Sequence, residues 1–300
     1  MARTLIVGAT GHLGQEMVKA CKKQGHDVHA LVRPATRKDA VKMKPLEDAG
    51  ARIHEGDLED YDSLLRACRG ADSVISAIGG FQIGQEGALV KAVKEAGVRR
   101  FIPSDFGLDP VASGPGSCVL FDAKAAVHRV IKDSAVPYTF IHSNAFFTYW
   151  AFSLGDLTKL GGTLPPAEVN VYGDGDVQSA LASVPDIAAV TVRALSDPKM
   201  QNKEVRITAN RMSQNELVDL WQRKSGRKVK KITVPAAEVD KVITSSTSPD
   251  QGGTLVVMQL LRSVWIRGDS VKRVATSLEA TELYPDIKFQ SVDEGLTQLL

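Results

Sequence analysis

Residues 4–14 read Thr4-Leu5-Ile6-Val7-Gly8-Ala9-Thr10-Gly11-His12-Leu13-Gly14. The run over residues 4–7 is short and almost wholly apolar, which is typical of a parallel strand buried on both faces. Behind it, apolar residues recur at helical spacing as far as Gly25, a natural C-terminal cap. A strand, a glycine-rich turn and a helix in this order predict a phosphate-binding βα unit.

Strand and helix signals alternate in the same way up to about residue 145. We expect strands at residues 27–32, 51–54, 73–77, 100–103 and 138–143, and helices at 39–49, 62–68, 84–96 and 120–134. Parallel neighbours need a helical crossover between them. The five successive βα steps therefore predict an α/β fold with a doubly wound parallel sheet of the NAD(P)-binding Rossmann type.

The alternation of strand and helix signals ends after about residue 145. Aromatic residues cluster there, and Gly161-Gly162 and Pro165-Pro166 follow as turn signals. Helices are expected at 185–195 and 214–224, a strand at 204–208 and a mobile loop at 250–253. We predict a dinucleotide-binding domain over residues 1–150 and a smaller substrate-binding lobe over residues 151–300, interleaved with the end of the sheet.

Composition excludes several functional classes. The 37 basic and 35 acidic residues give a net charge of +2 and are scattered, so we expect no nucleic-acid partner. No apolar run approaches the roughly 18 residues of a membrane span, and the first strand leaves no room for a signal peptide. We therefore expect a cytoplasmic protein. Its three cysteines are too few and too irregular for a disulfide framework or a zinc site, so no metal is expected.

The glycines of the first turn have separate roles. Gly8 permits the tight turn, Gly11 lets the backbone approach a pyrophosphate, and Gly14 lets helix and strand pack closely. The helix N-terminus offers free N–H groups to phosphates. We assign the intervening residues Thr10, His12 and Leu13 to the same contact, His12 through its backbone. The alternative is an ordinary βα turn.

The end of the second strand distinguishes NADP from NAD. The sequence there is Leu31-Val32-Arg33-Pro34, without the carboxylate that holds the ribose 2′-hydroxyl in NAD-binding sheets. A guanidinium suits a 2′-phosphate, and Lys42 could reach the same group. The alternatives are a solvated loop charge for Arg33 and a helix-surface lysine for Lys42. We predict NADPH as the cofactor.

Further residues are placed along the same sheet edge. Asp57, after the third strand, could accept from the adenine amino group or serve a turn or helix cap. The small residues after the fourth strand let ribose and diphosphate pass over the sheet, and we include Ala77, Ile78 and Gly79. Ser104 and Asn144 close two successive strands, so we assign them to the nicotinamide end together with Phe106. Capping is the competing role for Ser104 and Asn144.

With these pieces placed, the chain resembles the isoflavone reductase-like family of atypical short-chain dehydrogenases. That family includes phenylcoumaran benzylic ether reductases and pinoresinol–lariciresinol reductases and is related to the NmrA-like regulators. The resemblance covers nearly the whole length. It rests on the glycine turn, on residues 31–34, 74–79, 101–107 and 136–144, and on Glu282-Leu283-Tyr284-Pro285-Asp286-Ile287-Lys288-Phe289. It implies that Arg33 and Lys42 hold the 2′-phosphate.

The resemblance also implies that Lys124 is the catalytic residue. Ordinary short-chain dehydrogenases carry a tyrosine four residues before the lysine, but here that position is Leu120. In a partly desolvated pocket a lysine can relay a proton, and orienting the ribose hydroxyl is a compatible role. From the sequence alone, an exposed helix lysine is the alternative. Relatives generally carry an arginine that touches the cofactor where this chain has His128.

The aromatic cluster supplies a candidate substrate wall formed by Phe146, Phe147, Tyr149 and Trp150, with Phe106 beside it and Met258 and Trp265 as weaker candidates. Core packing is the alternative for each. The leading hypothesis is an NADPH-dependent reductase of an aromatic, phenylpropanoid- or isoflavonoid-like small molecule. The other hypothesis is an NmrA-like NADP-binding redox sensor without turnover. A homodimer is an open expectation.

Overall fold

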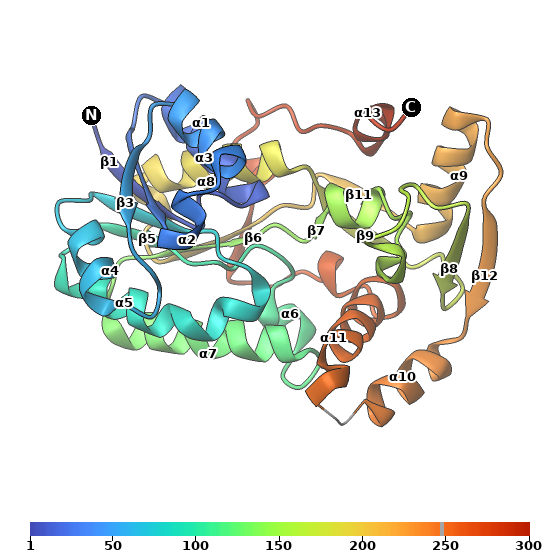
Figure 1. The fold of residues 1–300 in the computed structure, drawn as a ribbon. Helices are drawn as coiled ribbons and strands as arrows, with labels where there is room; N and C mark the ends of the chain where they lie inside the picture. The colour runs from blue at the N-terminus through green and yellow to red at the C-terminus, as the bar shows by residue number, and fades with distance from the viewer. Residues whose placement is uncertain (247–248) are drawn as a thin grey trace.

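The computed structural model describes residues 1–246 and 249–300 and has a parallel sheet at its centre (Figure 1). Its first five strands lie in the order β3-β2-β1-β4-β5, and all neighbours are parallel. They are β1 (Arg3–Val7), β2 (Asp27–Val32), β3 (Arg52–Glu55), β4 (Ser73–Ser76) and β5 (Arg100–Ile102). Strand order reverses between β1 and β4, which is where doubly wound sheets bind ligands.

The sheet continues past β5 with strands from distant parts of the chain. A parallel bridge between Phe101 and Tyr138 leads to β6 (Thr139–His142). Parallel to β6 runs β10 (Lys203–Arg206), and parallel to β10 runs β13 (Ser277–Glu279). Residues beyond 150 therefore complete the far edge of the same sheet.

Helices cover both faces of the sheet (Figure 1). One face carries α1 (His12–Lys23), α3 (Ala40–Asp48) and α8 (Val184–Ser196), and the other carries α4 (Tyr61–Cys68), α5 (Glu86–Glu95) and α7 (Val119–Ser134). Cys21 and Cys68 are buried in these two layers, and burial raises the pKa of both thiols to about 12. Three short helices, α2 (Pro34–Arg37), α6 (Pro110–Ser113) and α12 (Ala280–Leu283), lie in connections.

A smaller lobe follows β6. Its strands are β7 (Ala145–Phe146), β9 (Ser179–Ala182) and β11 (Asn210–Met212) in one sheet, and β8 (Glu168–Tyr172) with β12 (Lys230–Val234) in another. Its helices are α9 (Gln214–Ser225), α10 (Ala236–Ser245), α11 (Gly252–Leu261) and α13 (Val292–Thr297). Two π-helical turns, Phe147–Ala151 and Arg262–Ile266, bring Trp150 and Trp265 into edge-on contact in the lobe core.

The predicted fold class is confirmed, and the strands and helices expected before residue 145 are present with small shifts in their ends. The expected loop at residues 250–253 is wrong. Pro249–Gln251 is a 3₁₀ turn and α11 begins at Gly252, because the apolar run that follows buries Val256 and Leu261. No helix in the described ranges has the length and apolar character of a membrane span.

Two stacked histidines occupy the β2–β3 edge. His29 Nδ1 lies 2.6 Å from His54 Nε2, and His29 Nε2 lies 3.1 Å from the Asp27 carboxylate. At this distance only one of the two facing nitrogens can carry a proton, because a second proton would bring two N–H groups into opposition. Burial lowers the pKa of both rings below the usual 6.5, although Asp27 opposes the shift at His29.

This pair predicts acid sensitivity. A histidine whose pKa is lowered by folding stabilises the protein fully above pH 6.5, and that contribution is lost as the pH falls below it. Thermal melts from pH 8 to pH 5 should show a falling Tm for the wild type and a flatter profile for His54→Gln. Parallel profiles for the two proteins would contradict this explanation.

Candidate active site

Two adjacent cavities lie along the carboxyl edge of the sheet and together form the groove described below. One cavity runs from Arg33 past the glycine turn, and a second, of about 380 Å³, runs from the turn to Trp150. The two cavities share four lining residues, Gly11, Ala77, Ile78 and Gly79. The glycine turn thus lies in the middle of the groove, where the diphosphate of an extended dinucleotide would lie.

The glycine turn is shaped by close backbone contacts. Gly8 has φ +79°, and a Cβ there would lie 2.5 Å from the Ala77 carbonyl oxygen. A Cβ on Gly14 would lie 2.1 Å from the Gly8 carbonyl oxygen, so strand and helix touch there, and Gly14 packs rather than lines the groove. Helix α1 starts after Gly11 with neither a side-chain cap nor an acidic residue in its first turn. Its N–H groups are therefore available to a phosphate.

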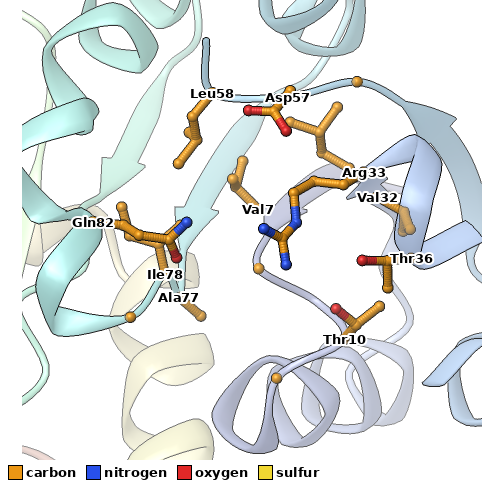
Figure 2. Close-up of a pocket in the computed structure, with 15 residues that line it drawn as sticks. Val7, Thr10, Val32, Arg33, Thr36, Asp57, Leu58, Ala77, Ile78 and Gln82 are labelled. Atoms are coloured by element: carbon orange, nitrogen blue, oxygen red, sulfur yellow. The ribbon is translucent and has the colours of Figure 1, made fainter.

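Arg33 marks one end of the groove. Its side chain reaches into the cavity, with Thr10 and Thr36 on the same side and Gln82 across from them (Figure 2). Within the described part of the chain, the Arg33 guanidinium has neither an ion-pair partner nor a hydrogen-bond partner. An unpaired cation beside two hydroxyls suits a phosphate.

Lys42 and Asp57 line a shallow cavity next to Arg33. The Lys42 amine forms an ion pair with Asp39 at 3.0 Å, so it lies beside the phosphate position but has a partner already. The Asp57 carboxylate accepts from the Glu59 backbone N–H at 3.1 Å and also borders the main cavity. The turn role is therefore present, and the adenine role stays a prediction.

Lys124 lies at the other end of the groove and is buried. Its amine donates to the Asp105 carbonyl oxygen at 3.1 Å. A Cβ on Gly107 would lie 2.9 Å from the Lys124 amine, so this glycine leaves room for it. Leu120 lines the same cavity one turn earlier, which puts an apolar side chain where a tyrosine would otherwise stand.

Ser104 and Asn144 border this cavity together with Phe106, and both also brace the backbone. The Ser104 hydroxyl donates to the Ile78 carbonyl at 2.8 Å. The Asn144 amide donates to the Ile207 carbonyl at 2.8 Å, and Asn144 adopts a left-handed φ of +60°. Asparagine tolerates that conformation better than most residues.

Three of the four predicted wall aromatics line the cavity: Phe146, Tyr149 and Trp150. Phe146 and Tyr149 stack at 5.9 Å, and Tyr149 is 48% exposed. Phe147 is placed differently from the prediction, because it is 2% exposed, packs against Gly295 and borders a separate cavity.

The C-terminal candidates for the wall are also corrected. Trp265 is buried behind Trp150 and donates to the Gly155 carbonyl at 2.8 Å, so it belongs to the lobe core. Met258 packs partly buried against that core and does not line the cavity, whereas Leu260 does. Side-chain direction on α11 therefore decides which residue reaches the groove, and an apolar run does not reveal it.

Sequence reasoning missed a buried charge cluster behind Lys124. The Asp105 carboxylate lies 2.9 Å from His128 Nε2 and 3.0 Å from His142 Nδ1. His128 therefore faces Asp105 and is not among the cavity-lining residues, where relatives were expected to use an arginine. Glu86, also buried, accepts from the Ser104 backbone N–H at 2.8 Å, and burial raises its pKa to about 7. The signal in the sequence was the polar residues Asp105 and His142 next to apolar strands.

Together, the Rossmann-type sheet, the glycine-lined groove and a buried lysine without its tyrosine partner define an atypical short-chain dehydrogenase. Comparison with known proteins agrees with this class. The chain belongs to the NmrA-like family, which matches residues 2–296.

Its relatives include plant reductases. A phenylcoumaran benzylic ether reductase of Ginkgo biloba is 35% identical over 310 residues, with 100% of this chain and 99% of the relative covered. The crystal structure of isoflavone reductase is 34% identical, with TM-score 0.87 and 99% of each chain covered. AtPrR2, solved with NADP+ and (+)pinoresinol, is 31% identical with TM-score 0.86, covering 100% of this chain and 99% of that one. The resemblance to isoflavone reductase-like proteins is thereby confirmed.

Arg33 should decide cofactor preference. Arg33→Ala removes one charge-assisted pair, which should cost NADPH binding about 1.5–3 kcal/mol and leave NADH binding nearly unchanged. Calorimetric titration of both cofactors measures the difference. An equal loss for NADPH and NADH would refute the 2′-phosphate assignment.

Proposed function

We propose that this chain is an NADPH-dependent reductase of an aromatic, phenylpropanoid- or isoflavonoid-like small molecule, with Lys124 as the proton donor. The observation that carries the proposal is the single groove that joins an unpaired Arg33 to a buried Lys124 under an aromatic wall. A dinucleotide carries the phosphates that Arg33 and the glycine turn suit, and its nicotinamide end would face Lys124.

The residues present fit NADPH. Arg33 and Thr36 would hold the 2′-phosphate, with Lys42 nearby and Asp57 toward the adenine. The glycine turn and the start of α1 would hold the diphosphate through Thr10, Gly11, His12 and Leu13, and Ala77, Ile78 and Gly79 would underlie it. Ser104, Phe106 and Asn144 would border the nicotinamide. When bound there, NADPH supplies the hydride.

Lys124 supplies the proton in this proposal. Burial lowers the pKa of its amine, while the neighbouring Asp105 carboxylate raises it. The ammonium is thus a stronger acid than a lysine in water, and it stays anchored through the Asp105 carbonyl. It can give a proton to a substrate oxygen or carbon in the cavity and regain one from water.

The substrate class follows from the cavity walls. Phe146, Tyr149 and Trp150 form one side, with Leu120 and Leu260 among the other apolar groups. Apolar pockets with few polar groups bind flat aromatic ligands well. AtPrR2, with a similar fold, was solved with an aromatic ligand, (+)pinoresinol.

Several earlier predictions stay within the proposal. They are the cofactor-binding domain over residues 1–150, the lobe over residues 151–300 with α8, β10 and β13 interleaved, the cytoplasmic location and the homodimer.

A redox sensor would need the groove but not a buried lysine that faces an aromatic cavity. The arrangement of Lys124 therefore favours the enzyme.

Lys124→Ala tests the catalytic assignment. Loss of a general acid should lower turnover by about 10²–10⁴-fold while NADPH affinity stays within a few fold. The assay follows NADPH oxidation over a panel of aromatic enones and benzylic ethers. Lys94→Ala, which removes an exposed lysine in the last turn of α5, is the matched control and should keep wild-type turnover.

Two outcomes of this assay would go against the proposal. Full activity in Lys124→Ala would remove the lysine from the mechanism. Absence of turnover by the wild type on every compound of the panel, with NADPH bound, would favour the sensor.

Tyr149 and Phe147 form a second matched pair. Tyr149→Ala should raise KM for an aromatic substrate with little change in Tm, because the ring is half exposed on the cavity wall. Phe147→Ala should lower stability by about 3–5 kcal/mol through the cavity it leaves, with KM nearly constant. Steady-state kinetics and denaturant titration separate the two, and the reverse pattern would contradict the assigned positions.

A further inference from the structure

A buried set of charges lies directly behind Lys124, and the function proposed above uses only its Asp105 and leaves the two histidines without a role. Asp105 stands at its centre, with His128 Nε2 at 2.9 Å and His142 Nδ1 at 3.0 Å from one carboxylate oxygen. The other oxygen lies 3.9 Å from the Lys124 amine. Each of these four side chains is less than a tenth exposed. At such burial, charges interact strongly because water does not screen them.

His142 faces carboxylates on both sides of its ring. Beyond Asp105, its Nε2 lies 3.8 Å from an Asp109 oxygen and 3.7 Å from a Glu204 oxygen. Burial alone would lower the pKa of His142, but the three carboxylates outweigh it and raise the pKa to about 10. Three carboxylates around one buried ring therefore favour its imidazolium form. In the same way the two histidines hold the pKa of Asp105 below its usual range, although burial opposes them.

We propose that His142 is a positioning residue for Lys124: its imidazolium takes up part of the Asp105 charge and so sets how readily Lys124 releases a proton. This inference rests on the proposed role of Lys124 as proton donor. The chain of contacts is short, because Asp105 touches His142 through one oxygen and faces Lys124 through the other. Among the described residues, Asp105 is also the one carboxylate within 4.0 Å of the Lys124 amine.

The direction of the effect follows from the charges. An unshared Asp105 carboxylate would hold the proton on Lys124 and make it a weaker acid. With the imidazolium present, that charge is shared and Lys124 releases its proton more readily. His128, one turn after Lys124 on α7, lies 2.9 Å from the same oxygen, and its charge interaction lowers the pKa of Asp105 when His142 is changed. The other ionisable groups that face the cluster are Glu86, Asp109, Cys118, Lys132, Glu204 and Arg206.

Two substitutions should move Lys124 in opposite directions. His142→Asn keeps a donor near the place of Nδ1 but removes the positive charge, so the pKa of Lys124 should rise by about one unit or more. Asp105→Asn removes the neighbouring anion, so the pKa of Lys124 should fall by a similar amount. A residue that merely filled space would not produce shifts of opposite sign.

The primary measurement is NMR on the cofactor-free protein. Lysine labelled at the ε-carbon reports the Lys124 titration directly, and Lys124→Met identifies its signal. Labelled imidazole nitrogens of His142 should show both nitrogens protonated from pH 6 to pH 9. His29→Asn, which removes another buried histidine of the same sheet, is the matched control and should leave the Lys124 pKa unchanged. Circular dichroism and thermal melts verify that each variant is folded.

The second measurement is the pH dependence of turnover. The alkaline limb of kcat/KM should move to higher pH in His142→Asn and to lower pH in Asp105→Asn. If the two substitutions shift the Lys124 titration but neither the wild type nor any variant turns over, this inference is supported and the proposed function is contradicted. If turnover depends on Lys124 but neither substitution shifts its titration, the proposed function is supported and this inference is contradicted.

Two further results would overturn the inference. One is a neutral His142 ring in the NMR spectra. The other is a stoichiometric divalent cation in the purified protein whose removal by a chelator changes the Lys124 titration, because a cation between Asp109, His142 and Glu204 would then take the place of the proton. If His142→Asn fails to fold, the protonation state of His142 in the wild-type spectra and the shift of the Lys124 pKa in Asp105→Asn still test the inference.

Discussion

The position of the groove depends on one close contact between three backbone segments. At Gly8, Gly14 and Ala77, the first strand, the first helix and the end of β4 meet so closely that a single Cβ on Gly8 or Gly14 would collide with a carbonyl oxygen. This contact points the start of α1 at the switch point of the sheet. It also leaves an open channel above β1 and β4, and both halves of the groove meet there. The remaining functional groups are placed relative to that channel.

The cations at the two ends of the groove differ in whether a carboxylate lies next to them. Arg33 stays open to the cavity and unpaired within the described residues, so its charge is available to a ligand. Lys124 is buried, and its charge is balanced from behind by Asp105, which in turn is balanced by two histidines. Burial makes the Lys124 ammonium a stronger acid than an exposed lysine, and the Asp105 carboxylate limits that shift. In the proposed function, cofactor binding and proton transfer therefore take place at opposite ends of the groove.

The sequence predicted well what local pattern determines. The apolar run before Gly8, the glycines themselves and the helix caps define the early βα units, and these appear as expected. Arg33 and Lys124 line the groove as a strand end and a family resemblance predicted, and their roles stay predictions. Phe147, Met258 and Trp265 were misjudged because an aromatic or apolar residue in a run does not reveal which side it faces.

The rest depended on contacts between distant parts of the chain. Strands β10 and β13 join the sheet beside β6, and no local signal announces a neighbour more than 60 residues away. The charge cluster arises from the same pairing, because Glu204 comes from β10 and His142 from β6. Thr36 is reached only because the short α2 turns back toward the groove. Residues of this kind can be assigned to the site only when the pairing of the distant strands is known.

The most direct test of this account is a crystal structure of the protein with NADP+ and an aromatic ligand. The 2′-phosphate should lie within hydrogen-bonding distance of the Arg33 guanidinium, and the nicotinamide ring should lie between the Lys124 amine and the aromatic wall. A cofactor lying in the reverse direction, or a phosphate bound away from Arg33, would contradict it.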